Sequence, residues 1–584
     1  MSFHKHQLDV FLRIHQYDTE QVQYSFVMSQ IAVLKRTGTV LLMVGPATTL
    51  AVSPFSNFDP INLIKMIFVA SSALGLLFLL LPSIKSHIAK LPMGIRVSSI
   101  VFITWMSLVI LVSDAPMNQQ FWGVFGRNNG YLGYFCLVIV LLATAIVQEK
   151  TFYHKLVDVL VLTAAPTTIY AMIQIAGRDP ISWSQMAPFA TLGNINFSSA
   201  FFGLASISAT VLALAPKQNL YLRLLLLVMV VVDLFIILET GSIQGFMIYI
   251  AGMGFAGFFF VRACKPIKIL QIPYLFLGLV GFALTALALN NVGPFARFVF
   301  GETILFRFDY WYAGWAMTLK NPVFGVGLDS YGDWYREVRG ETATLRTTPD
   351  RITNTAHNIY LDISASGGFP LIVAYLFLLV YALRAAWRLM RREDSFNPYF
   401  VALFSTWIAY LIQAAISINQ IGVGIWGWLF TGALIGYEIA TRKDESGRTE
   451  RKSKIESPQL PASVALLGIL GVGVGFLLAF IPFNADAKFK DALQTGNPAD
   501  QFTRAKAVGA TAYHMELALD AAIKANNEPL AEEIVDALLS RYPRDFMGWQ
   551  VRQVLASASP AERERAYARL KQLDPFNPNI QRVG

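Results

Sequence analysis

Thirteen long apolar runs, each close to the roughly 20 residues that a helix needs to cross a bilayer, dominate this chain of 584 residues. Hydrophobic residues make up 55% of the chain and charged residues only 15%, which excludes an ordinary soluble domain. We therefore predict a mainly α, polytopic membrane protein with about 13 transmembrane helices. The runs lie at 37–53, 61–82, 95–113, 131–148, 156–176, 197–215, 221–239, 242–261, 269–290, 358–383, 399–417, 422–440 and 461–483.

Lys and Arg residues are concentrated in every second connecting segment. If the N-terminus is cytoplasmic, the short outer loops carry only Arg127 and Arg178, whereas the inner segments carry 24 Lys and Arg residues. This asymmetry follows the positive-inside rule, and it explains the net charge of +9 without nucleic-acid binding. It predicts a cytoplasmic segment 1–36, a membrane domain 37–483, and a large loop 291–357 and a tail 484–584 that both lie outside the cytoplasm.

The large loop carries Arg and Lys residues nearly balanced by Asp and Glu, and loops of this length are usually functional. Its stretch RFDYWYAGWAMTL has helical spacing that places Arg307 and Trp311 on one face of an interfacial helix. Such aromatic rings either anchor in lipid headgroups or stack on sugars or an isoprenoid. At the far end of the loop, His357 and Asn358 stand where the next apolar helix begins.

Further polar residues stand at the outer ends of other runs. Arg127 lies among glycines in FGRNNGYLGYF, where it is either a headgroup anchor or a ligand contact. Asn194 and Asn196 enter the sixth run, either as helix N-caps or as a polar cavity lining. Gln244 lies one turn into the eighth helix, where its side chain is a candidate to face a cavity. Asp233 falls within the seventh run, where a charge is costly, and it has no evident partner in the sequence.

Only two cysteines, Cys136 and Cys264, occur, and both lie in or beside apolar runs, which favours small packing residues over a disulfide framework. We find no cluster of metal ligands in the sequence, and we predict neither a metal nor a cofactor.

The tail 484–584 is charged, Ala-rich and helical in pattern. Its stretches HMELALDAAIKANN, LAEEIVDALLSRY, DFMGWQVRQVLA and AERERAYARLKQL all have apolar residues at helical spacing. Pro543 and Pro575 end helices about one tetratricopeptide period apart. The pattern predicts either a tetratricopeptide-like repeat that binds a protein partner or a small helical bundle without one.

Four stretches together resemble the O-antigen ligase and polymerase superfamily: FGRNNGYLGYF, TLGNINFSSAFF, RFDYWYAGWAMTLKNPVFGVGLDSYG and TAHNIYLDISASGGFPLIVAYL. The resemblance covers roughly residues 115–440, and its most specific part runs from Arg307 to Leu361. It implies a bacterial inner-membrane glycosyltransferase that moves a glycan from undecaprenyl diphosphate to an acceptor hydroxyl without a metal or a nucleotide sugar. It also implies that His357 is the essential histidine and Arg307 the loop arginine of such enzymes.

The chain departs from this family at one position. The family often has Ser-Arg-Gly near the start of the helix after the tight turn, but this chain reads Ser-Ile-Gln-Gly, with Gln244 in place of the arginine. Arg127, Arg336 and Arg339 are candidates to bind the donor diphosphate in its place.

The residue types suit this chemistry. Guanidinium groups bind a diphosphate bidentately and stabilise its departing charge, and a histidine can accept the proton of a hydroxyl near neutral pH. A ligase acting on a surface polymer, lipid or protein is the first hypothesis. The alternatives are a repeat-unit polymerase and a lipid-glycan flippase. Because the polar residues concentrate at outer helix ends, transfer is favoured over transport, and the helical tail favours the ligase.

Overall fold

The computed structural model describes residues 28–582 except 54, 56, 182, 184–187, 347, 393–394 and 446–458. The described residues form helices and connecting loops without a strand, as the apolar runs predict. Residues 1–27, most of the predicted cytoplasmic segment, lie outside this description. The described part of a first helix covers 28–50, so residues 28–36, which precede the predicted apolar run, are also helical.

The helices of the membrane part follow one another along the chain. They are α2 (Asn62–Leu80), α3 (Ile84–Ile88), α4 (Met93–Val112), α5 (Met117–Trp122), α6 (Tyr131–Val147), α7 (Lys150–Ile175), α8 (Ile195–Ala213), α9 (Leu220–Glu239), α10 (Gln244–Ala263), α11 (Gln271–Leu289), α12 (Ala296–Val299), α13 (Glu302–Lys320), α14 (Tyr331–Val338), α15 (Glu341–Leu345), α16 (Ile359–Arg392), α17 (Pro398–Ala414), α18 (Ile421–Glu445) and α19 (Ala462–Thr495).

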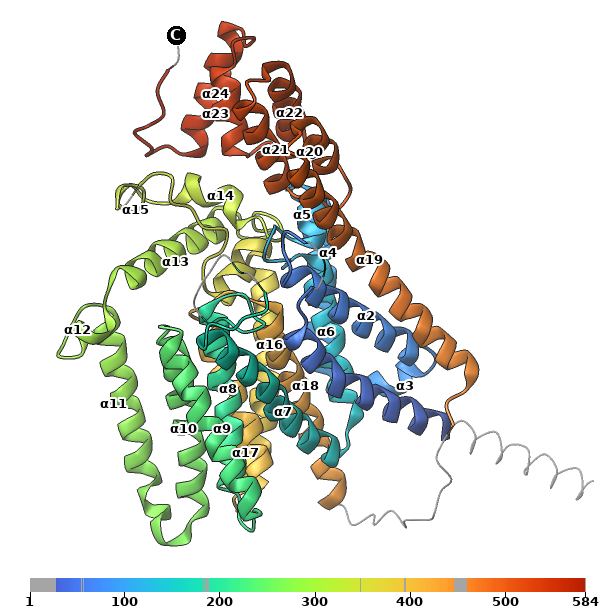
Figure 1. Ribbon diagram of the computed structural model, residues 1–584. Helices are drawn as coiled ribbons and strands as arrows, with labels where there is room; N and C mark the ends of the chain where they lie inside the picture. Colours follow the sequence, from blue (N-terminus) through green and yellow to red (C-terminus); the bar gives the residue numbers. More distant parts are fainter. Residues whose placement is uncertain are drawn as a thin grey trace, which may run out of the picture.

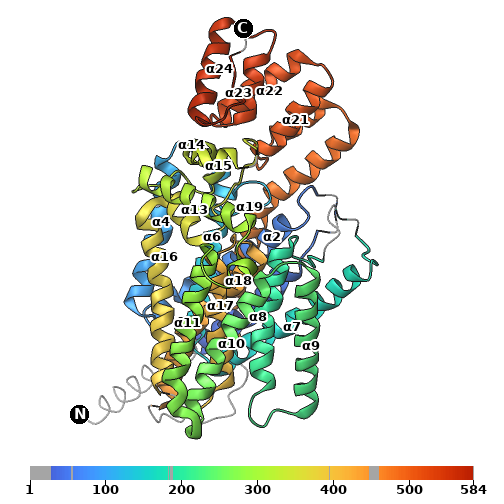
Figure 2. The ribbon, with the colours of Figure 1, turned by 90° about the vertical axis from the view of Figure 1, so that its left-hand side faces the viewer.

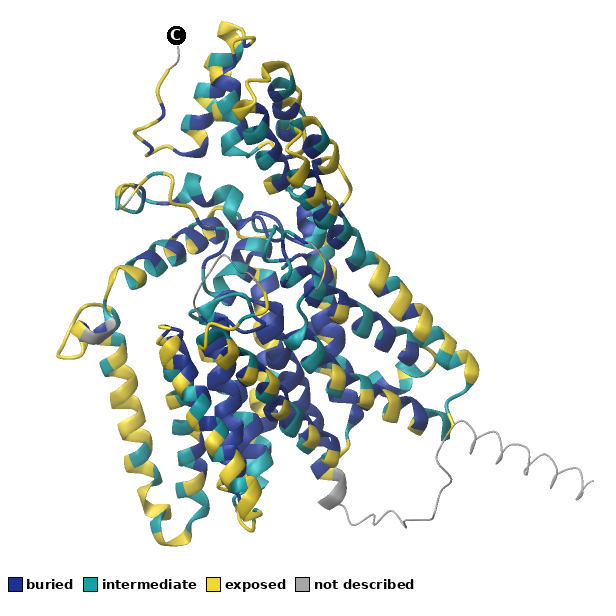
Figure 3. Cartoon of the chain, viewed as in Figure 1, coloured by how far each residue is buried: buried dark blue, intermediate teal, exposed yellow. Residues whose placement is uncertain are grey.

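Ten of the described helices are long and apolar enough to cross a membrane, and α6 and α17 are shorter apolar helices. The protein is therefore a polytopic α-helical membrane protein. Figure 1 shows these helices side by side in a bundle, with the large loop and the tail at the same end of it. Figure 3 shows α11 at the edge of the bundle, largely exposed, and Ala288 is its only buried residue. We expect lipid to cover this apolar surface.

Small residues allow the closest helix pair to form. Gly471 and Gly475, one turn apart on α19, face the backbone of α2, where an added Cβ would lie 2.3 Å from the carbonyl oxygens of Leu74 and Ala70 respectively. This spacing of small residues is typical of close helix packing in membranes. Because α19 is continuous from Ala462 to Thr495, it extends past the predicted end of the membrane domain at 483 and carries the tail.

Two charges inside the spans have structural partners. The Lys65 ammonium group donates to the carbonyl oxygens of Thr48, Thr49 and Ala51, at 2.8–3.0 Å, where the helix 28–50 ends. A cation is favourable at a helix C-terminus. The side chain of Asp233 accepts a hydrogen bond from Thr168 at 2.5 Å and from Ser206 at 3.3 Å, so it joins α7, α8 and α9.

A glycine-rich turn fixes the large loop against α16. Gly325 and Gly368 both have positive φ, and an added Cβ on either would come within 2.3 Å of a backbone oxygen on the other segment. The α16 helix is kinked at Gly368, which frees backbone groups for this contact. Val326 N donates to Ala365 O at 2.8 Å and Phe369 N donates to Pro322 O at 2.8 Å. The turn 322–332 is therefore held in register with the helix that follows His357.

The tail consists of α20 (Pro498–Ala505), α21 (Ala512–Lys524), α22 (Glu528–Arg541), α23 (Phe546–Val554) and α24 (Pro560–Leu573), each packed on its neighbour. The four predicted helical stretches coincide with α21 to α24. Figures 1 and 2 both show the tail above α14 and α15, so it covers the end of the bundle that holds the large loop. A tetratricopeptide-like binding role for the tail remains a prediction.

Candidate active site

His357 lies in a tight loop just before α16, with a left-handed backbone at φ 52°. Side chains on both sides hold this strained conformation. The Thr355 hydroxyl accepts a hydrogen bond from His357 N at 3.1 Å, and Asp362 Oδ1 accepts one from Ala356 N at 2.6 Å. Asn358 Oδ1 accepts hydrogen bonds from the backbone amides of Tyr360, at 3.0 Å, and Leu361, at 3.1 Å. Asn358 is therefore the N-cap of α16. The imidazole is thus presented from a rigid loop.

Arg127 reaches the same loop from a distant part of the sequence. The segment between α5 and α6 turns sharply, with positive φ at Gly123, Gly126 and Asn128. Its two glycines therefore allow the backbone conformation of this loop. Asp329 Oδ2 accepts a hydrogen bond from Val124 N at 2.7 Å and fixes this segment to the large loop. Arg127 Nε then donates to Asn354 Oδ1 at 3.3 Å, three residues before His357.

Helix α13 packs against the His357 loop, largely through apolar side chains. An added Cβ on Gly314 would lie 3.3 Å from the Cβ atoms of Ala356 and Leu361, and Thr318 Oγ1 lies 3.0 Å from Ser364 Oγ on α16. The ring of Tyr310 lies 5.1 Å from the His357 ring. Arg307 on α13 is partly exposed beside this contact.

Trp311 is also on α13, where its ring meets Phe308 edge-on at 5.5 Å. Its indole N–H is buried and has no hydrogen-bond partner among the described residues. The opposite face of α13 exposes Tyr312, Trp315 and Leu319. The α13 helix thus has one side packed on the site and a second, apolar side that is exposed, and its interfacial position remains a prediction.

The charges around His357 keep its imidazole neutral. Burial lowers the pKa of His357 to about 4, and the positive charges of Arg127 and Arg307 lower it as well, opposed by a hydrogen bond to the Thr355 backbone. Arg127 also faces Asp329, Asp362 and Asp59, whose negative charges favour its charged form against the burial that lowers its pKa. The site therefore combines an unprotonated base with two cationic groups.

A small cavity of about 20 Å³ lies between the Arg127 loop and the His357 loop. Its polar lining includes Asn129, Asp329, Asn354, Thr355 and Asp362. Burial raises the pKa of Asp329 to about 6, although hydrogen bonds from the Arg127 loop and the charge of Arg127 oppose this shift. No three His, Cys, Asp or Glu side chains of the described residues come together as metal ligands.

The other predicted residues lie apart from this cluster. Asn194 is the N-cap of α8, since its side chain accepts from Asn196 N at 2.9 Å. Asn196 accepts from the Ser242 hydroxyl at 2.7 Å and thereby joins the starts of α8 and α10. Gln244 is buried at the start of α10, and neither atom of its amide has a partner among the described residues.

Arg336 and Arg339 also lie elsewhere, because their guanidinium groups bind the tail. Arg339 Nη2 lies 2.7 Å from a carboxylate oxygen of Asp574, and Arg336 Nη1 lies 3.0 Å from the same oxygen. In this arrangement Arg127 and Arg307, and not Arg336 or Arg339, share the electrostatic environment of His357.

Asp362 and Asn354 are site residues that the sequence reasoning missed. A carboxylate one turn into an apolar span is a signal in itself, because charge in a span is costly. Asn354 had no such signal, since a polar residue in a polar loop is ordinary.

Comparison with known proteins gives one family match, in the membrane part of the chain. A family model described as O-antigen ligase matches residues 196–376, from the start of α8 into α16. The match includes Arg307, the glycine-rich turn and His357, and it leaves Arg127 and the tail outside. No curated protein matches the chain at a significant level. Residues 196–376 of the membrane part are therefore similar to the O-antigen ligase family.

Proposed function

We propose that the protein is a membrane glycosyltransferase of the ligase type, which transfers a glycan from undecaprenyl diphosphate to a hydroxyl of a surface polymer, lipid or protein. The observation that carries the proposal is that Arg127 donates to the His357 loop at Asn354 and that α13, which carries Arg307, packs on the same loop, at the end of the bundle that bears the large loop. The O-antigen ligase match supports a glycan-transferring enzyme in general. We place this end outside the cytoplasm of a bacterial inner membrane, following the positive-inside pattern.

In this mechanism, Arg127 and Arg307 bind the diphosphate of the donor. His357 takes the proton of the acceptor hydroxyl, and the oxygen attacks the anomeric carbon. The bond between that carbon and the diphosphate oxygen breaks, and its electron pair leaves with undecaprenyl diphosphate. The guanidinium groups stabilise the charge that develops on this leaving group. Such a single displacement inverts the anomeric centre.

The charge arrangement also couples donor binding to the base. The positive charges of Arg127 and Arg307 lower the pKa of His357 in the free protein. A bound diphosphate places negative charge beside the same arginines, so it opposes their effect and raises the pKa of His357. The histidine then becomes a stronger base when the donor is present.

Transport is less well supported than transfer. A flippase needs a polar path through the spans, but Lys65 and Asp233 are both buried and fully engaged in contacts between neighbouring helices. A repeat-unit polymerase, in which a second lipid-linked glycan is the acceptor, uses the same groups and is the main alternative. The tail at the same end as the site favours a large acceptor.

The direct test is transfer by the purified protein in vesicles, with lipid-linked glycan from the native membranes as donor. We expect Arg127→Gln and Arg307→Gln to weaken binding of undecaprenyl diphosphate and to slow transfer, whereas Arg178→Gln, at an exposed arginine away from the site, leaves both unchanged. Normal binding and transfer in both site variants would exclude this diphosphate site. In cells without the protein, long unattached glycans on the carrier indicate a ligase, and single repeats indicate a polymerase.

A further inference from the structure

The tail contacts the segment that carries Arg127. The ring of Tyr513 on α21 stacks on Phe125 at 4.8 Å, two residues before Arg127. Asn118 Nδ2 donates to Ala510 O at 2.6 Å, and Gly509 N donates back to Asn118 Oδ1 at 3.2 Å. These contacts fix the tail to the residues on either side of the turn into the Arg127 loop.

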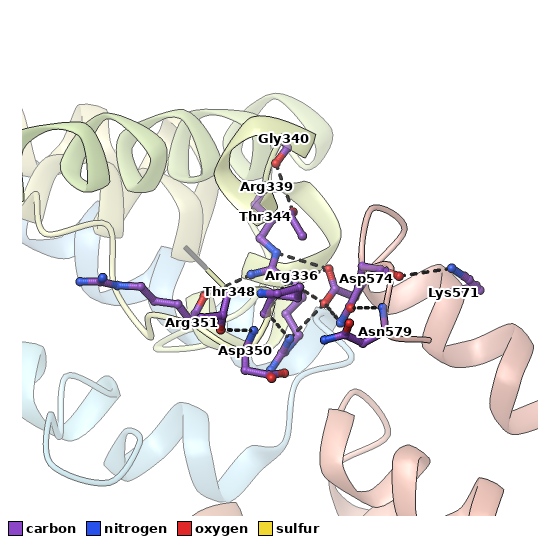
Figure 4. Close-up of polar contacts among 12 residues, drawn as sticks. Arg336, Arg339, Gly340, Thr344, Thr348, Asp350, Arg351, Lys571, Asp574 and Asn579 are labelled. Carbon is purple, nitrogen blue, oxygen red and sulfur yellow. Dashed lines mark hydrogen bonds and ion pairs between the residues drawn. The ribbon is translucent and has the colours of Figure 1, made fainter. Parts of the chain in front are cut away.

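The tail also contacts the segment that leads to His357. Figure 4 shows the carboxylate of Asp574, just after α24, enclosed by Arg336 and Arg339. The Asp574 side chain is fully buried and that of Arg339 is 1% exposed. Arg339 Nη2 donates to both carboxylate oxygens, at 2.9 and 2.7 Å, and Asn577 Nδ2 donates to one of them at 2.9 Å.

The same arginines continue the contact into the loop. Arg339 donates to Pro349 O at 2.7 Å and to Arg351 O at 3.1 Å, and Arg336 donates to Pro349 O at 3.0 Å. Two residues further on, the Thr353 hydroxyl donates to Thr355 O, and Thr355 in turn binds His357. Hydrogen bonds from Asp574 to Arg351 and from Thr353 to His357, joined by the covalent chain between residues 351 and 353, thus connect the tail with the histidine.

We infer that the tail is a structural part of the active site, in which Asp574, acting through Arg339, is a positioning residue for His357. This inference rests on the proposed function. It differs from recruitment of an acceptor, because the groups involved are buried between the tail and the loop and present no surface to a partner. A buried ion pair often contributes little to stability, and fixing one conformation is a role that such pairs can have.

The test compares Asp574→Ala and Arg339→Met with Glu564→Gln, which breaks an exposed ion pair of the same tail with Arg582. Hydrogen exchange of residues 348–358 is measured in the intact protein, along with binding of undecaprenyl diphosphate, hydrolysis of the lipid-linked glycan by water, and transfer to the native acceptor. We expect faster exchange of 348–358 in the first two variants only. The kcat for hydrolysis and for transfer falls by the same factor, about 10²-fold, the usual effect of misplacing a catalytic group by about 1 Å.

The outcomes separate the two roles of the tail. Loss of native transfer with unchanged hydrolysis and unchanged exchange would assign recruitment and overturn the inference. If Asp574→Ala also speeds exchange throughout 498–573, the tail has unfolded in that variant. The comparison is then made with Asp574→Asn, which keeps the side-chain shape and one acceptor oxygen, and the same outcomes decide the question. If the unaltered protein transfers no lipid-linked glycan, the proposed function fails, and the exchange of 348–358 still decides whether Asp574 holds this loop.

Discussion

The pH dependence of transfer tests the electrostatic environment of His357. Because burial and the charges of Arg127 and Arg307 lower its pKa to about 4, the base is already unprotonated near pH 5.5. An ordinary histidine has a pKa of about 6.5, so lowering the pH from 7 to 5.5 would reduce its unprotonated fraction roughly eightfold, whereas a pKa of about 4 predicts a loss of only about 3%. We expect the part of kcat/KM that depends on His357 to stay nearly constant over this interval and to fall as the pH passes through about 4.

The pH dependence of kcat has a different expected midpoint. The value of kcat/KM reports groups of the free enzyme, and kcat reports the donor complex. Since a bound diphosphate raises the pKa of His357, kcat should fall at a higher pH than kcat/KM does. The assay is the initial rate of transfer in vesicles from pH 4 to 8, with binding of undecaprenyl diphosphate measured at each pH.

Two variants identify the group that titrates. His357→Ala should lower kcat by about 10²–10⁴-fold, the usual contribution of a general base, leave donor binding in place and remove the transition near pH 4. Asp329 has a pKa of about 6, so its protonation produces a separate transition that Asp329→Asn should remove. A transition near pH 6.5 that persists in Asp329→Asn and disappears in the double variant with His357→Ala, or normal transfer by His357→Ala, would refute the assignment of His357 as a base in this environment.

Three further changes have defined outcomes. Arg307→Lys keeps the charge and loses the bidentate fork, so the KM for the donor should rise and transfer should slow; unchanged kinetics would place the diphosphate elsewhere. Lys65→Met leaves three buried carbonyl oxygens without their donor and should lower the free energy of unfolding by about 2–4 kcal/mol in detergent, whereas Lys90→Met at an exposed site should not. A reporter fused after Gly584 should lie outside the cytoplasm, and a reporter inserted near Glu450 should lie inside it. Neither position is among the described residues, and the reverse result would contradict the predicted topology.

The apolar runs predicted the helices well, because a bilayer imposes a length and a composition that are visible in the sequence. The ends of the helices were less predictable. The α16 helix continues to Arg392 and α19 to Thr495, since helical hydrogen bonding does not stop where the apolar residues stop. The kink at Gly368 depends on the backbone of the turn 322–332, which is a contact between distant segments and leaves no periodic signal.

The candidate site was only partly predictable from the sequence. His357, Arg307 and Arg127 were predicted from residue type, position and the family resemblance, and in the structure burial and both arginines lower the pKa of His357. The carboxylates that face Arg127 could not be assigned, because they come from three separate segments. Arg336 and Arg339 were chosen as loop arginines, and the sequence does not reveal that a carboxylate 235 residues after Arg339 binds it.

The site is assembled from three short segments, at 123–130, 302–320 and 353–358, that are distant in the sequence. Each is held by its own local contacts, but their mutual placement depends on the parts that join them. Asp329 joins the Arg127 loop to the large loop, and Asp362 ties the His357 loop to α16. The tail contacts the first segment through Tyr513, and Asp574 reaches Pro349 and Arg351, just before the third segment, through Arg336 and Arg339. Since displacement by about 1 Å is enough to slow catalysis strongly, a domain that connects both segments determines their geometry even if it also binds an acceptor.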